Sequence, residues 1–262
     1  MSKLLIDADG IVYRAGFAME KTKYLCQRGD KFHEVDDIKA HRAETRGEGD
    51  IIWSRKEVKS EDEALMLTSI IVKDIYERYP EKSPSLFLTP SVGNFRDLLS
   101  TRQKYKGNRD QSARPVHFKA IRQYLIDKYD AVEAVGQEAD DELGIGMTEH
   151  PGSVCVSFDK DLLQVPGLHY NWVTKEETTI SKKQGALNFY AQVLSGDSVD
   201  NVPGIEGIGP VKAKKILEGA KNNEEARQRV LKKYVETYGS ELGQQYFQET
   251  AALVWVRRER MK

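Results

Sequence analysis

Residues 138–144 read EADDELG, and this acid-rich stretch lies between two apolar segments of the chain. Glu138, Asp140, Asp141 and Glu142 crowd their carboxylates together, and like charges this close raise each other's proton affinity. Acids are favoured in the first turn of a helix, so a surface helix beginning at Glu138 accounts for one or two of them. The other acids of this stretch are not explained by a helix start. They would be explained if acids elsewhere in the chain formed a common site with them.

Length and composition limit the function classes. With 262 residues the chain can bury a sizeable core, as one domain or as one domain with a small module. The formal net charge of −1 does not indicate a nucleic-acid partner, so any such partner depends on local basic patches. Cys26 and Cys155 lie far apart in the sequence, and we expect both to be ordinary reduced thiols. The N-terminus has no apolar segment long enough for a signal peptide or a membrane span, so we expect a cytoplasmic protein with no membrane association.

Apolar runs alternate with helical periodicity over the first two thirds of the chain. We predict strands at 3–7, 85–89, 131–135, 153–158 and 168–172, and helices at 10–19, 61–79, 115–128 and from 138. This alternation predicts an α/β fold with a central, mainly parallel sheet and flanking helices.

Two further regions complete the predicted organisation. Residues 24–35 predict a hairpin that turns at 28–30, and residues 36–50 predict a loop or a weak helix. From residue 184 the chain is almost entirely helical in pattern. We therefore expect an α/β core over 1–183 and a helical module over 184–262.

Acids follow the predicted strands at several separate places. Asp7 and Asp9 end the first strand, Asp159 and Asp161 follow the strand at 153–158, and SGDSVDN adds Asp197 and Asp200. Each pair alone also fits a helix cap or a turn. Together they predict one site, because the carboxyl ends of parallel strands meet at one edge of a sheet.

So many carboxylates in one site require counter-charge. No Cys or His accompanies them, and oxygen ligands favour hard divalent cations, above all Mg²⁺. Two such ions about 3.5–4 Å apart can activate water and stabilise the oxygens of a phosphoryl group. The acids of 138–144 therefore predict a metal site.

Residues 202–216 read VPGIEGIGPVKAKKI and predict a contact with the DNA backbone. Backbone amides at a glycine-rich loop and helix start bind phosphate, and glycine permits close approach. The glycines are Gly204, Gly207 and Gly209, and the adjoining lysines, which add charge without base specificity, are Lys212, Lys214 and Lys215. The alternative is a glycine-rich turn with a solvated basic helix. A dinucleotide fingerprint is disfavoured because no strand leads into these glycines.

Residues 102–109 read RQKYKGNR and supply positive charge. Lys106 and Arg109 could bind a reacting phosphate and stabilise its transition state, and Tyr105 could stack on a base. The alternative is an ordinary solvated loop.

Five motifs occur in the order seen in one known family. LIDADGIVYRA, YKGNR, EADDE, SFDKD and GDSVDNVPGIEGIG resemble the FEN-like 5′-nuclease family, which includes the bacteriophage 5′→3′ exonucleases and flap endonucleases and the 5′-nuclease domain of DNA polymerase I. The resemblance runs from Lys3 to about Leu217. It implies a helical arch near 105–130 and a helix–three-turn–helix DNA-binding module near 194–218. It also implies metal-site acids at Asp7, Glu138, Asp140, Asp141, Asp159, Asp161, Asp197 and Asp200, and a catalytic basic pair at Lys106 and Arg109.

The same resemblance implies an activity. It is that of a structure-dependent 5′-nuclease which hydrolyses phosphodiester bonds at DNA 5′ ends or flaps with two Mg²⁺ ions, for which Mn²⁺ substitutes. It implies a monovalent K⁺ at the glycine-rich loop, duplex DNA or an RNA–DNA hybrid as partner, a monomer, and a role in DNA replication or repair. If the chain is phage-encoded, its location is the bacterial host cytoplasm.

Two departures leave alternatives open. The second strand continues into LFLTPSVGNFR, with Thr89 and Pro90 where the family carries an acid, and residues 21–50 have no counterpart. The missing acid permits a DNA-junction-binding protein with impaired catalysis. LIDADG also fits haloacid-dehalogenase-type phosphatases, with Asp7 as nucleophile and Asp9 as general acid, but that interpretation leaves EADDE, YKGNR and the glycine-rich loop unexplained.

Overall fold

The computed structural model describes residues 2–28, 30–35, 37–44, 51–109 and 114–260, which fall into two compact units. Unit 1 comprises 1–10, 74–113 and 125–262, and unit 2 comprises 11–73 and 114–124. Three of the four boundaries fall within helices α1 (Ala8–Ala18), α3 (Glu61–Arg78) and α5 (Phe118–Tyr129). Residues on both sides of the predicted division at 183/184 belong to unit 1.

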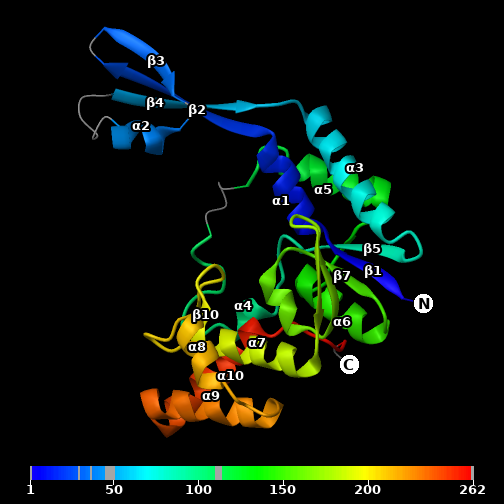
Figure 1. Cartoon of the computed structure of the whole chain (residues 1–262), viewed down its shortest axis with the longest axis vertical. Coiled ribbons are helices and arrows are strands. Elements are labelled where there is room, and N and C mark those ends of the chain that lie inside the picture. The colour runs from blue at the N-terminus through cyan, green and yellow to red at the C-terminus, as the bar shows by residue number, and fades with distance from the viewer. Residues whose placement is uncertain (1, 29, 36, 45–50, 110–113, 261–262) are drawn as a thin grey trace. The chain divides into compact units, whose positions relative to one another are not determined.

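Unit 1 contains a six-stranded sheet in the order β6-β5-β1-β7-β8-β9, of which Figure 1 labels β1, β5 and β7. The parallel strands are β1 (Lys3–Asp7), β5 (Ser83–Leu88), β6 (Val132–Glu133), β7 (Val154–Val156) and β8 (Gly167–Asn171). Strand β9 (Glu176–Ile180) runs antiparallel at the edge and was not predicted, because EETTI has no apolar run. The expected mainly parallel sheet is confirmed.

The central strand is apolar because both faces of the sheet are covered. Leu4, Leu5 and Ile6 are each at most 1% exposed. Helix α6 (Ala139–Glu149) packs against this core through Leu143, which is fully buried. A Cβ at Gly144 would lie 2.3 Å from the carbonyl oxygen of Arg257, so the C-terminal segment can cross α6 only because residue 144 is glycine.

The rest of unit 1 is largely helical after residue 181, as predicted. Its helices and short strands are α4 (Arg96–Leu99), the 3₁₀ helix η2 (Lys160–Gln164), α7 (Lys182–Ser195), β10 (Gly196–Asp197), β11 (Val202–Pro203), α8 (Pro210–Leu217), α9 (Asn223–Tyr238) and α10 (Ser240–Val254). Helices α7 to α10 share a second hydrophobic core, in which the fully buried Tyr234 donates a 2.7 Å hydrogen bond to the carbonyl of Val193. Within the described ranges, no helix combines the length and apolar composition needed to span a membrane.

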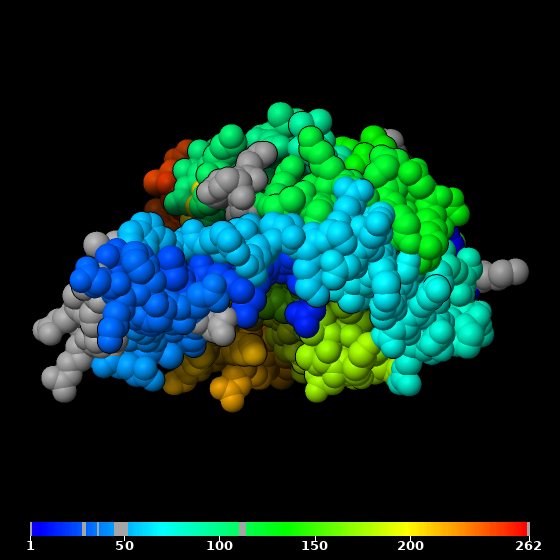
Figure 2. Space-filling model, turned by 90° about the horizontal axis from the view of Figure 1, so that it is seen from above, coloured from blue at the N-terminus to red at the C-terminus, as the bar shows by residue number. Residues whose placement is uncertain are grey.

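Unit 2 contains a three-stranded antiparallel sheet in the order β3-β2-β4 (Figure 1). The hairpin of β2 (Glu20–Arg28) and β3 (Lys31–Val35) confirms the prediction, although residue 29 of the turn lies outside the described residues. Strand β4 (Ile51–Val58) was not predicted. Between them, α2 (Ile38–Glu44) is the weak helix expected within 36–50. Most described side chains of β3 and α2, whose residues are coloured blue to light blue in Figure 2, are exposed.

The arch expected near 105–130 is described only in part. Residues 105–108 form a turn, α5 begins at Phe118, and residues 110–113 lie outside the described residues. The arch therefore stays a prediction.

Candidate active site

Carboxylates from separate segments of unit 1 come together at the carboxyl ends of its central strands. Asp7 ends β1 and Asp159 follows β7, the strand beside it. Asp140 lies in the first turn of α6, close enough to feel the charges of Asp7, Asp159 and Glu138. A cavity of about 30 Å³ is lined by five acids, which are Glu138, Asp140, Asp161, Asp197 and Asp200. The structure thus brings together seven of the eight predicted metal-site acids.

Mutual repulsion and burial perturb these acids strongly. Burial and the charge of Asp9 raise the pKa of Asp7 to about 7, even though Ser157 Oγ donates a 2.9 Å hydrogen bond to it. Burial raises the pKa of Asp140 well above its ordinary range, and the charges of Asp7 and Asp159 raise it further. Such shifts indicate anionic groups that lack a counter-charge.

Asp161 and Asp197 form a carboxyl–carboxylate pair. Burial, the charge of Asp159 and a hydrogen bond to Asp197 raise the pKa of Asp161 to about 8. Partial burial also raises the pKa of Asp197, but that hydrogen bond and the amides of Asp200 and Val199 lower it overall. The two residues therefore hold one proton between them at neutral pH.

Asp141 is the acid that the structure turns away from the others. It is fully buried and accepts two hydrogen bonds from Arg96, from Nη1 at 2.7 Å and from Nη2 at 2.9 Å. The backbone amides of Glu138 and Arg257 donate to the same carboxylate at 3.1 Å and 2.9 Å. Both oxygens of Asp141 accept hydrogen bonds, and the residue caps α6 and neutralises Arg96. Neither oxygen is left free to bind a metal ion, as the predicted role requires.

Arg96 was not predicted from the sequence. Only 3% of it is exposed, and besides Asp141 it binds the carbonyls of Leu253 (2.9 Å) and Trp255 (2.7 Å). It lies 3.8 Å from Glu138 Oε2. Although burial alone lowers the pKa of Arg96, its bonds to Asp141 keep that pKa above the ordinary value. Arg96 therefore links α6, which carries the acids, to the C-terminal segment.

Lys106 and Arg109 lie beside the acids. The ammonium of Lys106 pairs with Glu138 and lies 3.6 Å from Asp200, and Arg109 pairs with the other oxygen of Asp200. Burial lowers the pKa of Lys106, but the charges of Glu138 and Asp200 raise it overall, so Lys106 is cationic. Lys106 has a φ of +52°, and its amide donates to the carbonyl of Asp200 at 2.8 Å. This backbone bond holds the basic turn against the segment that carries Asp200.

The prediction that Tyr105 stacks on a base is wrong for this conformation. Its ring is 4% exposed, and its hydroxyl lies 2.8 Å from Asp200 Oδ2 and 3.1 Å from Glu138 Oε2. A buried ring has no free face for a base. Tyr105 instead orients two of the acids and supports the ammonium of Lys106, 5.0 Å from the ring centroid.

Thr89 takes the place of the acid expected after the second strand. Its amide donates to Asp9 Oδ2 at 2.8 Å, and its hydroxyl accepts a 3.0 Å hydrogen bond from the amide of Ala139. Thr89, which follows β5, therefore connects the first turn of α1 to the start of α6 without adding a charge.

The donor set fits hard divalent cations. The converging side chains of Asp7, Glu138, Asp140, Asp159, Asp161, Asp197 and Asp200 offer only carboxylate oxygens, which Mg²⁺ and Mn²⁺ prefer. The raised pKa values of Asp7, Asp140, Asp159 and Asp161 show that these four carboxylates would be stabilised by a cation, since Lys106 and Arg109 supply positive charge only on the side of Glu138 and Asp200.

The glycine-rich loop and its basic helix form a second part of unit 1. Gly209 is the N-cap of α8 and Pro210 its first residue, so the free amides of the helix start point into the loop. A Cβ at Gly204 would lie 2.3 Å from the amide nitrogen of Gly196, so this glycine is required by packing. Gly207 has a φ of +74° and open space around it. The ammonium of Lys212 donates to the carbonyl of Gly207 at 2.8 Å, and Lys214 and Lys215 are exposed.

Comparison with solved structures identifies the fold. The T5 D15 protein co-crystallised with metal ions superposes with a TM-score of 0.57 at 14% identity, over 98% of this chain and 91% of the other. T5 5′-exonuclease with bound divalent metal ions (zinc) gives 0.52 at 14% identity, over 97% and 100%. A complex of the bacteriophage T5 flap endonuclease with DNA and metal ions gives 0.52 at 18% identity, over 73% and 82%. The chain therefore has the fold of these phage nucleases, as the resemblance implied.

Comparison by sequence gives a shorter match. DNA polymerase I of Rhizobium leguminosarum is 38% identical over an alignment of 100 residues, and the match covers 33% of this chain and 10% of that protein. The chain thus spans about a tenth of the length of this relative. No family model matches. The likeness to phage nucleases and to DNA polymerase I agrees with the family suggested by the motifs and gives no support to the phosphatase alternative.

Proposed function

We propose that the chain is a metal-dependent 5′-nuclease that hydrolyses phosphodiester bonds at DNA 5′ ends or flaps. One observation carries the proposal: carboxylates from separate segments converge beside Lys106 and Arg109, at the strand ends of a fold shared with phage nucleases. Similarity to proteins crystallised with DNA and with metal ions supports the choice of substrate.

Two divalent cations, Mg²⁺ in the cell, would bind among the seven convergent acids. Such ions lower the pKa of a bound water and offset negative charge on a phosphoryl group. Asp7, Asp140 and Asp161 would be stabilised by such cations, since their pKa values are raised by burial and by other carboxylates. Asp141 would not be a ligand but would position α6 through Arg96.

Lys106 and Arg109 would stabilise the reaction at the phosphate. In the free protein Glu138 and Asp200 offset their charges. Once the acids are engaged by metal, these cations are available to the scissile phosphate, whose negative charge grows as the water oxygen bonds to phosphorus and the bond to the leaving oxygen breaks. The hydrogen bond from the amide of Lys106 to the carbonyl of Asp200 would keep the basic turn beside the site.

The loop at 204–209 and helix α8 would bind the duplex through its backbone. The free amides at the start of α8 and the exposed Lys214 and Lys215 can contact phosphates without reading bases. The helix–three-turn–helix assignment and the K⁺ ion expected at this loop are part of the proposal.

The test is digestion of a 5′-flap duplex labelled at either the 5′ or the 3′ end, with Mg²⁺ or with EDTA. The proposal predicts Mg²⁺-dependent release of short 5′-labelled products and no shortening from the 3′ end. Shortening from the 3′ end would contradict it. Tight flap binding without cleavage in Mg²⁺ or Mn²⁺ would favour the alternative of a junction-binding protein, for which Thr89 in place of an acid is the specific observation.

A further inference from the structure

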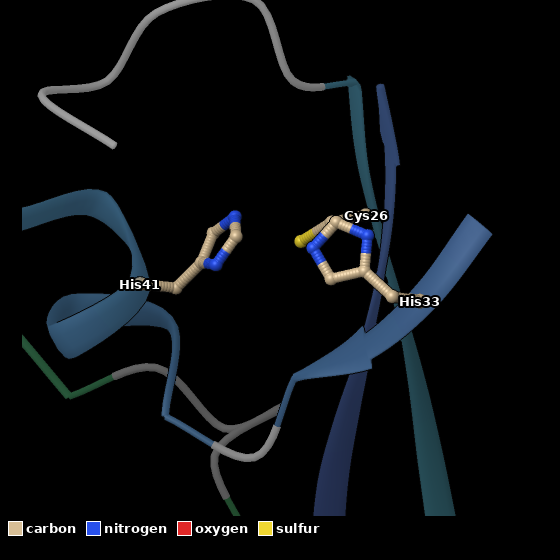
Figure 3. A group of neighbouring side chains, drawn as sticks. All are labelled: Cys26, His33 and His41. Atoms are coloured by element: carbon tan, nitrogen blue, oxygen red, sulfur yellow. The ribbon is translucent and has the colours of Figure 1, made fainter. Parts of the chain in front are cut away.

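Unit 2 carries a group of side chains that the proposed nuclease does not use. Cys26 of β2, His33 of β3 and His41 of α2 point toward one another (Figure 3). Each offers one ligand atom, and these atoms all lie within 4.8 Å of one another. The group lies in residues 21–50, the segment for which the FEN-like family offers no counterpart.

The sheet register places two of these residues together. Cys26 and His33 are direct partners in the antiparallel pair β2–β3, so their side chains project from the same face. Ile52 of β4 is the partner of Cys26 on its other side. The proximity of the thiol and the imidazole is therefore set by backbone pairing and not by one side-chain rotamer.

His41 comes from α2, a helix that is too short to be stable by itself. The helix has seven residues and no buried side chain. Asp37 caps it by accepting bonds from the amides of Lys39 (2.9 Å) and Ala40 (3.0 Å). A helix this short is not stable alone in water. The centroids of the His41 and His33 rings are 5.2 Å apart, and the ring planes are tilted by 56°. A metal bond from His41 to ligands on the sheet would fix α2 to the strands.

The burial of the group suits a metal with one open position. Cys26 is fully buried and forms no disulfide, His41 is partly buried, and His33 is exposed. Solvent therefore reaches the group from the side of His33. The simpler interpretation, a buried thiol covered by two surface imidazoles, predicts no metal binding.

We propose that Cys26, His33 and His41 form a Zn²⁺ site that fastens α2 to the sheet of unit 2. Thiolate and imidazole are the donors that Zn²⁺ prefers, at about 2.3 Å for sulfur and 2.0–2.1 Å for nitrogen, and both suit Mg²⁺ poorly. Three protein ligands leave the fourth tetrahedral position to water. The separations within 4.8 Å allow three ligand atoms to close on one ion by small side-chain movements. This site does not depend on the proposed nuclease activity.

The test uses Co²⁺ as a spectroscopic substitute for Zn²⁺ in the full chain, reduced and stripped with EDTA. A thiolate-to-cobalt charge-transfer band with tetrahedral d–d bands should saturate at one equivalent and disappear when Zn²⁺ is added. Carboxylate ligands do not give this charge-transfer band, so Co²⁺ bound by the acid cluster alone does not contribute to it. The other thiol, Cys155, is buried in β7 of unit 1, so substitution of Cys26 tells the two thiols apart.

Substitutions assign the ligands. Cys26→Ser should abolish the charge-transfer band, and His33→Gln and His41→Gln should each weaken Co²⁺ binding at least ten-fold. His33 is exposed, so its variant should fold even if Cys26→Ser does not. His150→Gln, in unit 1, is the matched control and should keep the band. Zn²⁺ should also slow amide exchange in α2.

Three results would overturn the site. One is a reduced protein without any charge-transfer band. Another is a band that persists unchanged in both His33→Gln and His41→Gln. The third is a band that survives Cys26→Ser, which would assign the thiolate to Cys155.

Discussion

The carboxylate cluster of unit 1 offers oxygen donors only, whereas the Cys26–His33–His41 group of unit 2 offers one sulfur and two imidazoles. The first is assembled from distant segments at the strand ends of a parallel sheet, and its members repel one another. The second comes from one hairpin and the helix that follows it. Donor chemistry therefore separates the ions that each group would bind, hard divalent cations in unit 1 and Zn²⁺ in unit 2.

A second comparison lies within α6 itself. Asp140 and Asp141 are adjacent, yet Asp140 faces three other acids and Asp141 faces Arg96. Successive helical residues point about 100° apart, so one turn can serve both the metal site and the core. Acids next to each other in a motif therefore need not share a role.

The largest expected effect on cleavage among the basic residues is at Lys106. Lys106→Ala removes a cation that gains most when charge builds on the phosphate, so the single-turnover cleavage rate should fall on the order of 10²–10³-fold. Flap affinity should change only a few-fold. The measurement is rate and Kd on one labelled flap, with Lys104→Ala, in the same loop, as the control. A defect confined to Kd would show that Lys106 only positions DNA.

Asp141→Asn and Asp140→Asn should change stability in opposite directions. Asp141→Asn leaves Arg96 buried without a full counter-charge, which costs about 3–5 kcal/mol of unfolding free energy. Asp140→Asn removes repulsion and should raise the stability of the metal-free protein. Urea unfolding in EDTA measures both, and equal destabilisation by the two variants would contradict the different roles.

Metal removal should give an unusual pH dependence. The pKa values of Asp7 and Asp161, about 7 and 8 when folded, exceed the unfolded value of about 3.9, so the folded protein holds more protons between about pH 4 and 8. Stability in EDTA should therefore fall as pH rises through this window, and Mg²⁺ should offset the fall. Thermal unfolding from pH 5 to 8 checks this; a Tm that rises with pH in EDTA would contradict the perturbed cluster.

The smallest expected effect concerns α8. Lys214→Glu with Lys215→Glu should weaken duplex binding equally on all sequences, and the log–log salt slope should fall by about one per lost phosphate contact. Lys212 is kept because it also binds the carbonyl of Gly207. Fluorescence anisotropy on two unrelated duplexes at several salt concentrations measures this. Sequence-dependent losses would exclude a backbone contact.

The sequence predicted most of the sheet and of the acid cluster. Apolar runs ending in acids are local signals, and the parallel topology brings their ends together without further information. Strand β4 and edge strand β9 were missed because their residues alternate weakly or are polar, and only pairing with β2 and β8 makes them strands.

Other features could not be predicted from local pattern. Nothing in EADDE shows that Asp141 points to Arg96, which depends on the crossing of the C-terminal segment. Tyr105 was expected to meet DNA, but burial against Asp200 removes that option. The pairing of Cys26 with His33 could have been predicted, because the register counted back from the hairpin turn places them opposite each other. The position of His41 could not, because it depends on how α2 packs.

The most direct test of the central claim combines two readouts on Asp140→Asn. With Mg²⁺ and a labelled 5′ flap, this variant should lose cleavage by at least about 10²-fold while binding DNA. In the same preparation the cobalt–thiolate band should keep wild-type intensity, and His150→Gln should match wild type in both assays. Cleavage by Asp140→Asn at the wild-type rate would show that the carboxylate cluster is not the catalytic centre.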